Sequence, residues 1–181
     1  IACRTDFDLR RHTEASGVDL SYFDPETKER YRPFVIEPAG GINRMALTFL
    51  IDAYEEEQLG PDETRSVLHF HPEIAPITVG VFPLVKRDGM PEKARELERD
   101  LRLSRLSTFY DEKAAIGRRY RRQDEVGTPY CVTIDGDTLK DDVVTIRERD
   151  SMQQVRVKSG EVRSWILEAV RHWKRPAKKL A

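Results

Sequence analysis

The chain has 181 residues, a formal net charge of -1, 35% charged residues and two cysteines. This length suits one or two domains, and no apolar run approaches the ~20 residues that a membrane-spanning helix needs. We therefore exclude a membrane protein and a disulfide scaffold, and we predict a cytoplasmic protein in which Cys3 and Cys131 are reduced.

Charge is distributed unevenly along the chain. Residues 1–60 carry twelve acidic and seven basic side chains, whereas residues 161–181 carry two acidic and six basic ones. An acidic partner is therefore expected to bind the C-terminal part. Its basic tail, formed by Lys174, Arg175, Lys178 and Lys179, could either solubilise the terminus or contact a nucleic-acid backbone.

Residues 1–60 contain two short runs of aromatic and β-branched residues, Leu20–Phe23 and Tyr31–Ile36. The Asp-Pro turn between them predicts an antiparallel hairpin. A double glycine follows, and then an apolar helix that we expect to continue to about Glu57. A region of this size does not bury an adequate core by itself. We therefore expect it to pack against further structure. The chain also begins at Ile1 without methionine, as if the front of a larger protein preceded it.

Residues 58–74 combine Gly60-Pro61, several acidic residues and Pro72, a composition that predicts a linker between two domains over residues 61–74. This stretch contains His69 and His71 at a spacing of two. A metal site would need a third ligand, and none is evident nearby in the sequence. We therefore expect the two histidines to have a packing or linker role, and we predict no metal site in the chain.

From residue 75 onward the sequence alternates between strands and helices. The patterns predict strands over 75–85, 108–110, 129–135, 143–149 and 153–157, and helices over 91–106, 115–126 and 161–174. This order predicts an α/β domain with a mixed sheet, since helical crossovers join parallel strands and tight connections join antiparallel ones. Trp165 and Trp173 lie on the apolar stripe of the last helix, where we expect them to pack in the core.

The segment EPAGGINR joins the end of a strand to the start of a helix. Gly40 and Gly41 would let backbone approach a ligand closely, because glycine has no Cβ and tolerates positive φ. A helix N-terminus attracts anions, and Arg44 in the first turn adds a full charge there, while Glu37 could accept from an ammonium group. The alternative is an ordinary strand-turn-helix corner with a solvent-facing arginine.

Longer stretches of the sequence favour the ligand-binding role of this segment, because they resemble a known family. PFVIEPAGGINR resembles motif 3 of class II aminoacyl-tRNA synthetases, specifically of the glycyl-tRNA synthetase family. HPEIAPITVGVFPLV is similar to the start of that family's anticodon-binding domain, and residues 116–157, IGRRYRRQDEVGTPYCVTIDGDTLKDDVVTIRERDSMQQVRV, resemble its continuation. The resemblance covers nearly the whole chain.

The resemblance implies a ligase that attaches glycine to its tRNA with ATP and Mg²⁺, as a homodimer. It implies a partial antiparallel α+β catalytic domain over residues 1–60, followed by a linker over residues 61–74. Residues 75–181 would form an α/β anticodon-binding domain with a mixed sheet and flanking helices. By similarity, the catalytic Arg44 would contact ATP, Gly41 would let the adenosine approach, and Glu37 and Ala39 would bind glycine.

Two departures from the family pattern affect this expectation. The family generally has serine where this chain has Ala39, and the missing hydroxyl forfeits about 0.5–1.5 kcal/mol of hydrogen bonding to glycine. Lys113, Ala114 and Gly136 also replace the usual residues, which would alter anticodon contacts. In this family, motif 1 forms the dimer interface and an arginine of motif 2 binds the α-phosphate of ATP. Both motifs would lie before Ile1, together with the part of the catalytic domain that mainly binds Mg²⁺. We therefore expect the chain alone to be inactive.

Four arginines surround a tyrosine on the second predicted helix of the C-terminal domain. Helical spacing indicates that Tyr120 faces the core, and we predict that the neighbouring charged residues face solvent and contact tRNA: Arg118, Arg119, Arg121, Arg122 and Asp124. A solvated basic face paired with nearby acids is the alternative at this helix. For the chain as a whole, the alternative to an enzyme fragment is a non-catalytic, free-standing tRNA-binding module.

Overall fold

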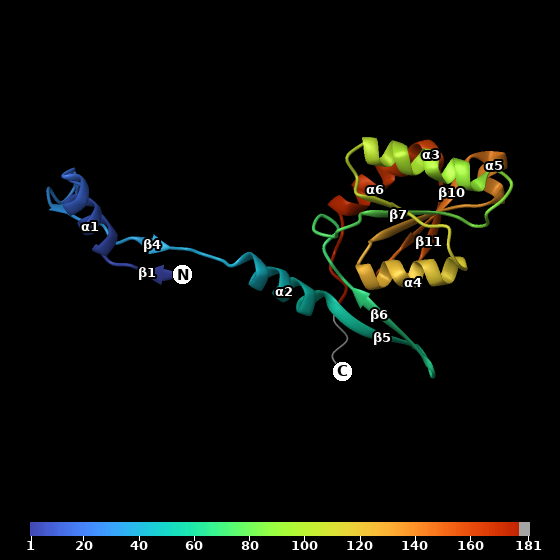
Figure 1. Ribbon diagram of the computed structural model, residues 1–181, viewed down its shortest axis with the longest axis horizontal. Helices are drawn as coiled ribbons and strands as arrows, with labels where there is room; N and C mark the ends of the chain where they lie inside the picture. The colour runs from blue at the N-terminus through green and yellow to red at the C-terminus, as the bar shows by residue number, and fades with distance from the viewer. Residues whose placement is uncertain (178–181) are drawn as a thin grey trace. The chain divides into compact units, whose positions relative to one another are not determined.

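The computed structural model describes residues 1–177 and divides into two compact units, unit 1 from Ile1 to Leu47 and unit 2 from Thr48 onward (Figure 1). The division falls before the predicted linker at 61–74. Of the expected basic tail, Lys178 and Lys179 lie outside the described residues.

Unit 1 contains short elements and no buried core. Its elements are β1 (Ala2–Cys3), α1 (Phe7–Ser16), β2 (Tyr22–Phe23), β3 (Arg30–Tyr31), β4 (Ile36–Glu37) and the start of α2 (Ile42–Ala53). The antiparallel pairing of β2 with β3 confirms the predicted hairpin, and β1 pairs antiparallel with β4. Across Ile1–Leu47, all of which the structure describes, no side chain is buried. This region therefore does not enclose a core of its own, as its size predicts.

A second hairpin follows α2 where the sequence predicted the end of a helix and a linker. Strand β5 (Tyr54–Gly60) pairs antiparallel with β6 (Glu63–Leu68), so the helix prediction is wrong over residues 54–57, and residues 63–68 of the predicted linker form a strand. Alternate side chains of the hairpin turn inward, which is the expected period of a strand. Most of the inward side chains are charged, and they find partners within unit 2, so the hairpin carries no apolar alternation for sequence reasoning to detect.

The core of unit 2 is a five-stranded mixed sheet. Its strands are β7 (Val79–Pro83), β8 (Thr108–Tyr110), β9 (Tyr130–Ile134), β10 (Val143–Glu148) and β11 (Gln154–Lys158), in the spatial order β11-β10-β9-β7-β8. Strand β7 runs parallel to β8 and β9, whereas β10 runs antiparallel to β9 and β11. The predicted mixed sheet is confirmed, because the connections through helices join the parallel pairs.

Helices cover both faces of this sheet (Figure 1). They are α3 (Met90–Leu103), α4 (Ile116–Val126), the short α5 (Gly136–Asp141) and α6 (Val162–Arg171), which follows a 3₁₀ turn at Ser159–Glu161. α3 and α6 lie on one face and α4 on the other. All three predicted helices are present, although α6 is shorter than expected, and α5 was not predicted. Within residues 1–177, no helix combines the length and the apolar composition needed to cross a bilayer.

The two faces of the sheet differ in chemistry. On the face under α3 and α6, Val81, Val132 and Ile146 are fully buried in an apolar core together with Leu97 and Ile166. Side chains alternate along a strand, so the intervening residues point toward α4. Several of these are polar and buried, namely Thr133, Thr145 and Arg147. The α4 face is thus built on hydrogen bonds and ion pairs, and the hairpin strand β6 packs against the same helix.

Candidate nucleic-acid interface

Helix α4 carries the predicted cluster of arginines, but it divides them between solvent and the protein interior. Arg118 is exposed, and the side chains of Arg121 and Arg122 keep 34% and 42% of their surface exposed. Arg119 and Asp124 are buried, with 2% and 0% exposure. The prediction that all five residues face a nucleic acid is therefore wrong for Arg119 and Asp124.

Arg119 stabilises the carboxyl end of β7. Its guanidinium donates to the backbone carbonyls of Pro83 at 2.6 Å, Asp111 at 3.2 Å and Leu84 at 3.2 Å, and it lies over the Phe82 ring. Burial lowers the pKa of this guanidinium, since the interior disfavours its charge. These three carbonyl oxygens thus fix the arginine inside the domain.

Asp124 is the centre of a buried ion cluster. It accepts two hydrogen bonds from Arg147 on β10, at 2.8 and 2.9 Å, and one from Arg65 on β6, at 3.1 Å. Arg121 approaches the same carboxylate to 3.6 Å from the solvent side. Bidentate pairing of this kind is strong and geometrically specific. Asp124 therefore joins the hairpin, the sheet and α4, and it is not available to contact a ligand.

A pocket of about 440 Å³ opens beside the exposed part of α4. Its lining residues come from β6, α4, β10 and the turn before β11: Glu63, Gly117, Tyr120, Arg121, Arg147 and Met152. The Arg147 guanidinium lies 4.9 Å from the centre of the Tyr120 ring, whose hydroxyl is 2.6 Å from Thr133 Oγ1. Burial raises the pKa of the Tyr120 phenol, which keeps it neutral near pH 7. The pocket wall thus combines an aromatic ring with two guanidinium groups, of which that of Arg121 is the more accessible, because the Arg147 side chain keeps only 4% of its surface exposed.

The exposed arginines of α4 differ in how firmly they are held, and one of them, Arg121, lines this pocket. Arg121 donates to Glu63 at 2.8 Å, and Arg122 donates to Asp111 at 2.7 Å and to the Lys113 carbonyl at 3.2 Å. In the part of the chain that the structure describes, no carboxylate pairs with Arg118. The Arg121–Glu63 pair is exposed and contributes little, so a phosphate oxygen can replace Glu63 at small cost, whereas the Asp111 carboxylate keeps 10% of its surface exposed and holds Arg122 more firmly. This surface can bind an anionic backbone while an unpaired base enters the pocket.

Sequence reasoning missed Arg147 and Met152 as members of this site. The alternation in VVTIRER does place Arg147 on the same face of β10 as Thr145, which is a usable signal. Tyr120 was expected in the core, and it is only partly buried because its ring also lines the pocket. Trp165 packs on the Tyr130 ring in the core as predicted, whereas Trp173 is partly exposed and donates to Asp150 at 2.7 Å.

The motif-like segment of unit 1 is exposed along its length. Glu37 ends β4 with its carboxylate 3.3 Å from Arg4, and Ala39 and Gly41 are exposed. Arg44 lies in the first turn of α2, as predicted, and it is exposed. Neither Gly40 nor Gly41 has the positive φ that we expected, since the glycines with that conformation among the described residues are Gly17, Gly89 and Gly127. The roles of these residues stay predictions.

Comparison with known proteins connects this geometry to a family. Residues 78–169, which include the whole sheet and most of its helices, match the family described as an anticodon binding domain. The chain is 53% identical over 171 residues to a glycine–tRNA ligase of Clostridium acetobutylicum, covering 94% of this chain and 36% of that relative. It is 53% identical to the glycine–tRNA ligase of Acetivibrio thermocellus, covering 91% and 35%, and 50% identical to that of Treponema denticola, covering 95% and 39%. The chain thus spans little more than a third of the length of these curated relatives, and the predicted resemblance is confirmed.

Proposed function

The chain belongs to the anticodon binding domain family, and from this premise we propose that unit 2 binds the anticodon region of glycine tRNA as part of a glycine–tRNA ligase. The observation that carries this proposal is the match over residues 78–169, because it covers the sheet, α4 and all lining residues of the pocket except Glu63. We place the binding surface on the outer side of α4.

The exposed arginines and the pocket supply the two parts that single-stranded RNA recognition needs. Arg118, Arg121 and Arg122 would bind phosphate oxygens, which position the RNA without reading its sequence. An unpaired anticodon base would stack in the pocket against the Tyr120 ring, which Arg147 supports from the protein side, since unpaired bases are read by stacking and by polar edges. A phosphate at Arg121 would displace Glu63, and the buried Asp124 would keep Arg147 in place from behind.

For the protein as a whole we propose the ATP-dependent attachment of glycine to this tRNA. ATP and Mg²⁺ would be its cofactors, and a cytoplasmic homodimer its working form. Within unit 1, the positive charge of Arg44 suits the triphosphate of ATP, and the carboxylate of Glu37 suits the ammonium group of glycine. Gly41 and Ala39 present no large side chain at this segment, which would let adenosine and glycine approach the backbone.

The second candidate is a non-catalytic module that binds tRNA without activating glycine. Its support is that unit 2 has its own apolar core and its own ion cluster. Both candidates predict binding of glycine tRNA, so this property does not separate them. Glycine-dependent pyrophosphate exchange by the complete protein separates them, because only the ligase performs it.

Binding of tRNA to the 181-residue chain tests the shared part of the proposal. We expect the chain to prefer glycine tRNA over the same tRNA with a changed anticodon, and its affinity to fall steeply with salt through counterion release. Replacing Arg118 and Arg121 by alanine should weaken binding and lower the salt slope by about 1 for each phosphate that the variant no longer neutralises. The matched control is Arg99→Ala, an exposed arginine on α3 at the opposite face of the sheet. Equal binding of both tRNAs, or equal effects of the two sets of variants, would refute the assigned surface.

A further inference from the structure

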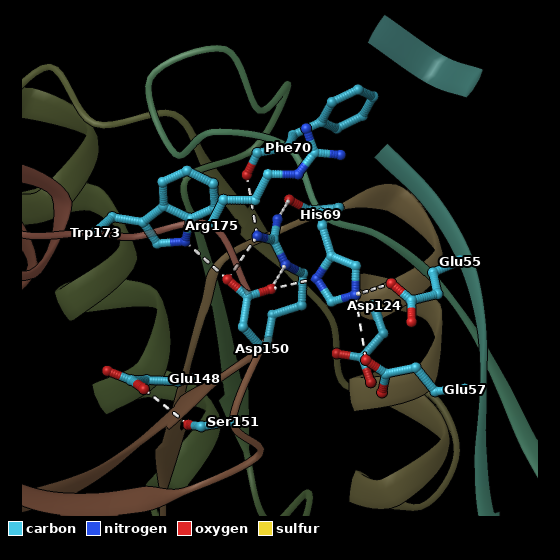
Figure 2. A network of polar contacts seen from close by, with 12 residues as sticks. Glu55, Glu57, His69, Phe70, Asp124, Glu148, Asp150, Ser151, Trp173 and Arg175 are labelled. Carbon is cyan, nitrogen blue, oxygen red and sulfur yellow. Dashed lines mark hydrogen bonds and ion pairs between the residues drawn. The ribbon is translucent and has the colours of Figure 1, made fainter. Parts of the chain in front are cut away.

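A buried histidine faces two carboxylates where the β5–β6 hairpin meets the rest of unit 2 (Figure 2). His69 directly follows β6, and its side chain keeps 4% of its surface exposed. Glu55 and Glu57 lie on β5 and point toward the ring. On the other side of the ring, Asp150 from the turn after β10 lies 2.7 Å from His69 Nδ1. Three carboxylates from two segments therefore converge at one imidazole.

The hydrogen bonds around Asp150 fix which nitrogen of His69 carries a hydrogen. Asp150 accepts from Arg149 through both oxygens, at 2.6 and 2.9 Å, and from the Trp173 indole at 2.7 Å. A carboxylate in this position acts as an acceptor, so we assign the hydrogen of His69 to Nδ1. In the neutral ring, Nε2 then presents a lone pair on the side of Glu55 and Glu57.

That lone pair has no hydrogen-bond partner among residues 1–177. His69 Nε2 lies 3.2 Å from Glu57 Oε1 and 3.8 Å from Glu55 Oε2, but neither contact has the geometry of a hydrogen bond. The other oxygen of Glu57 already accepts from Arg65 at 2.6 Å. No arginine or lysine of the described chain pairs with Glu55. A buried lone pair that faces two anionic oxygens is costly, and a cation placed between them removes this cost.

We propose that Glu55, Glu57 and His69 bind a divalent transition-metal cation, with Zn²⁺ as the best match. Their ligand atoms all lie within 4.8 Å of one another. In a tetrahedral zinc site with bonds of about 2.1 Å, neighbouring ligand atoms are roughly 3.4 Å apart. The observed separations of 3.2 and 3.8 Å lie on either side of this value. One imidazole and two carboxylates suit Zn²⁺, whereas Mg²⁺ and Ca²⁺ prefer oxygen ligands alone.

The surrounding residues match the outer shell of a zinc site. A ligating histidine usually donates its other N–H to a carboxylate, which fixes the ring orientation, and Asp150 occupies that position. Arg65 holds Glu57 in the same way from the other side. A bound ion would therefore join β5 to the end of β6 and, through His69 and Asp150, to the turn after β10. Its role would be structural, in fastening the hairpin to the sheet domain.

The strand register explains why the sequence hid this site. Val67 lies opposite Glu55, and Arg65 lies opposite Glu57. Since side chains alternate along a strand, Arg65, Val67 and His69 share one face, and the backbone N–H of His69 extends the pairing to the carbonyl of Ala53 at 2.8 Å. The missing third ligand is thus across the hairpin and not nearby in the sequence. His71, the apparent second ligand, instead packs edge-on against Trp173.

Zinc binding by the tag-free 181-residue chain tests the proposal, with exposed Cys3 replaced by serine so that no surface thiol competes. Calorimetric titration should detect one Zn²⁺ ion per chain. Glu55→Gln should weaken binding more than about 10-fold, the lower end of the loss seen when only a partner of a ligand is altered. Glu56→Gln is the matched control, because Glu56 is exposed on the same strand and contacts Tyr54. We expect it to bind Zn²⁺ as the parent chain does.

A second pair of variants and a second ion keep the test independent of folding defects. His69→Gln should abolish binding, whereas His71→Gln should preserve it, with circular dichroism used to verify the fold of each. Co²⁺ in the parent chain should give the strong visible absorption of a four-coordinate site, and Glu55→Gln should remove it. If His69→Gln does not fold, Glu55→Gln decides, since the ion pair of Glu55 within the described chain is with His69 itself. Failure of the parent chain to bind Zn²⁺, or an equal loss in Glu55→Gln and Glu56→Gln, would overturn the proposal.

Discussion

Charged side chains do opposite things in the two units of this protein. In unit 1, Arg4 pairs with Asp8 at the surface, and both side chains remain partly exposed, at 41% and 25%. In unit 2, Arg65 pairs with Asp124 at 0% exposure for both side chains. Surface pairs are screened by water, whereas a buried pair that loses one partner leaves an uncompensated charge. The same residue types are therefore incidental to folding in one unit and essential to it in the other.

Apolar side chains show the same contrast. Ile36 and Ile42 of unit 1 are 57% and 80% exposed, whereas Ile134 and Ile146 of unit 2 are fully buried. The strands of unit 1 are two residues long, so they form no sheet wide enough to cover an isoleucine. The difference shows that burial depends on what surrounds a residue and not on its hydrophobicity alone. It predicts that matched substitutions will have unequal effects in the two units.

The largest difference is expected for the buried ion cluster. Asp124→Asn leaves the Arg147 guanidinium buried without a carboxylate, which should lower the free energy of unfolding by about 3–5 kcal/mol. Urea unfolding followed by tryptophan fluorescence measures this, because both tryptophans, Trp165 and Trp173, belong to unit 2. The matched substitution in unit 1, Asp8→Asn, should leave unchanged both this curve and the unfolding curve followed by circular dichroism, which also detects unit 1. Similar stability for Asp124→Asn and the parent chain would mean that the cluster does not hold unit 2 together.

The second difference concerns the apolar core. Ile146→Ala removes side-chain volume from the centre of the core under α3 and α6, and we expect a loss of about 2–5 kcal/mol. Ile36→Ala removes the same atoms from an exposed strand, so it creates no cavity. Urea unfolding monitored by circular dichroism detects both units and compares the two variants directly. Equal effects would show that Ile36 is packed in solution and not exposed.

These contrasts also explain which parts of the fold could be predicted. Strand β8 and the end of α4 at Gly127 agree with the predicted positions, because apolar alternation and glycine act locally. Helix α1 was missed because its apolar positions form no clear stripe. This agrees with the structure, in which α1 buries no residue. The β5–β6 hairpin was missed for a related reason, as Glu57 and Arg65 satisfy each other where apolar residues would be expected.

The functional residues, too, could be placed from the sequence where no distant partner is involved, and not where one is. Arg118 was correctly expected at the surface, because nothing elsewhere in the described chain competes for it. Arg119 and Asp124 were placed wrongly, since their partners, the carbonyl of Pro83 and the guanidinium of Arg147, are distant in the sequence. Helical spacing gives the direction of a side chain relative to its neighbours. It does not show that a polar face of the sheet lies on that side.

The smallest difference is expected at two helix starts, and it separates local from tertiary stabilisation. Asp135 caps α5 by accepting from the backbone N–H groups of Asp137 and Thr138, both at 3.0 Å. Asp6 precedes α1 without a side-chain cap bond. Asp135→Ala should therefore cost about 1 kcal/mol in urea unfolding, whereas Asp6→Ala should cost nothing measurable. Asparagine caps helices as well as aspartate does, so Asp135→Asn should restore most of the loss. If it does not, the exposed ion pair between Asp135 and Arg156, at 3.2 Å, and not the cap, carries the stabilisation.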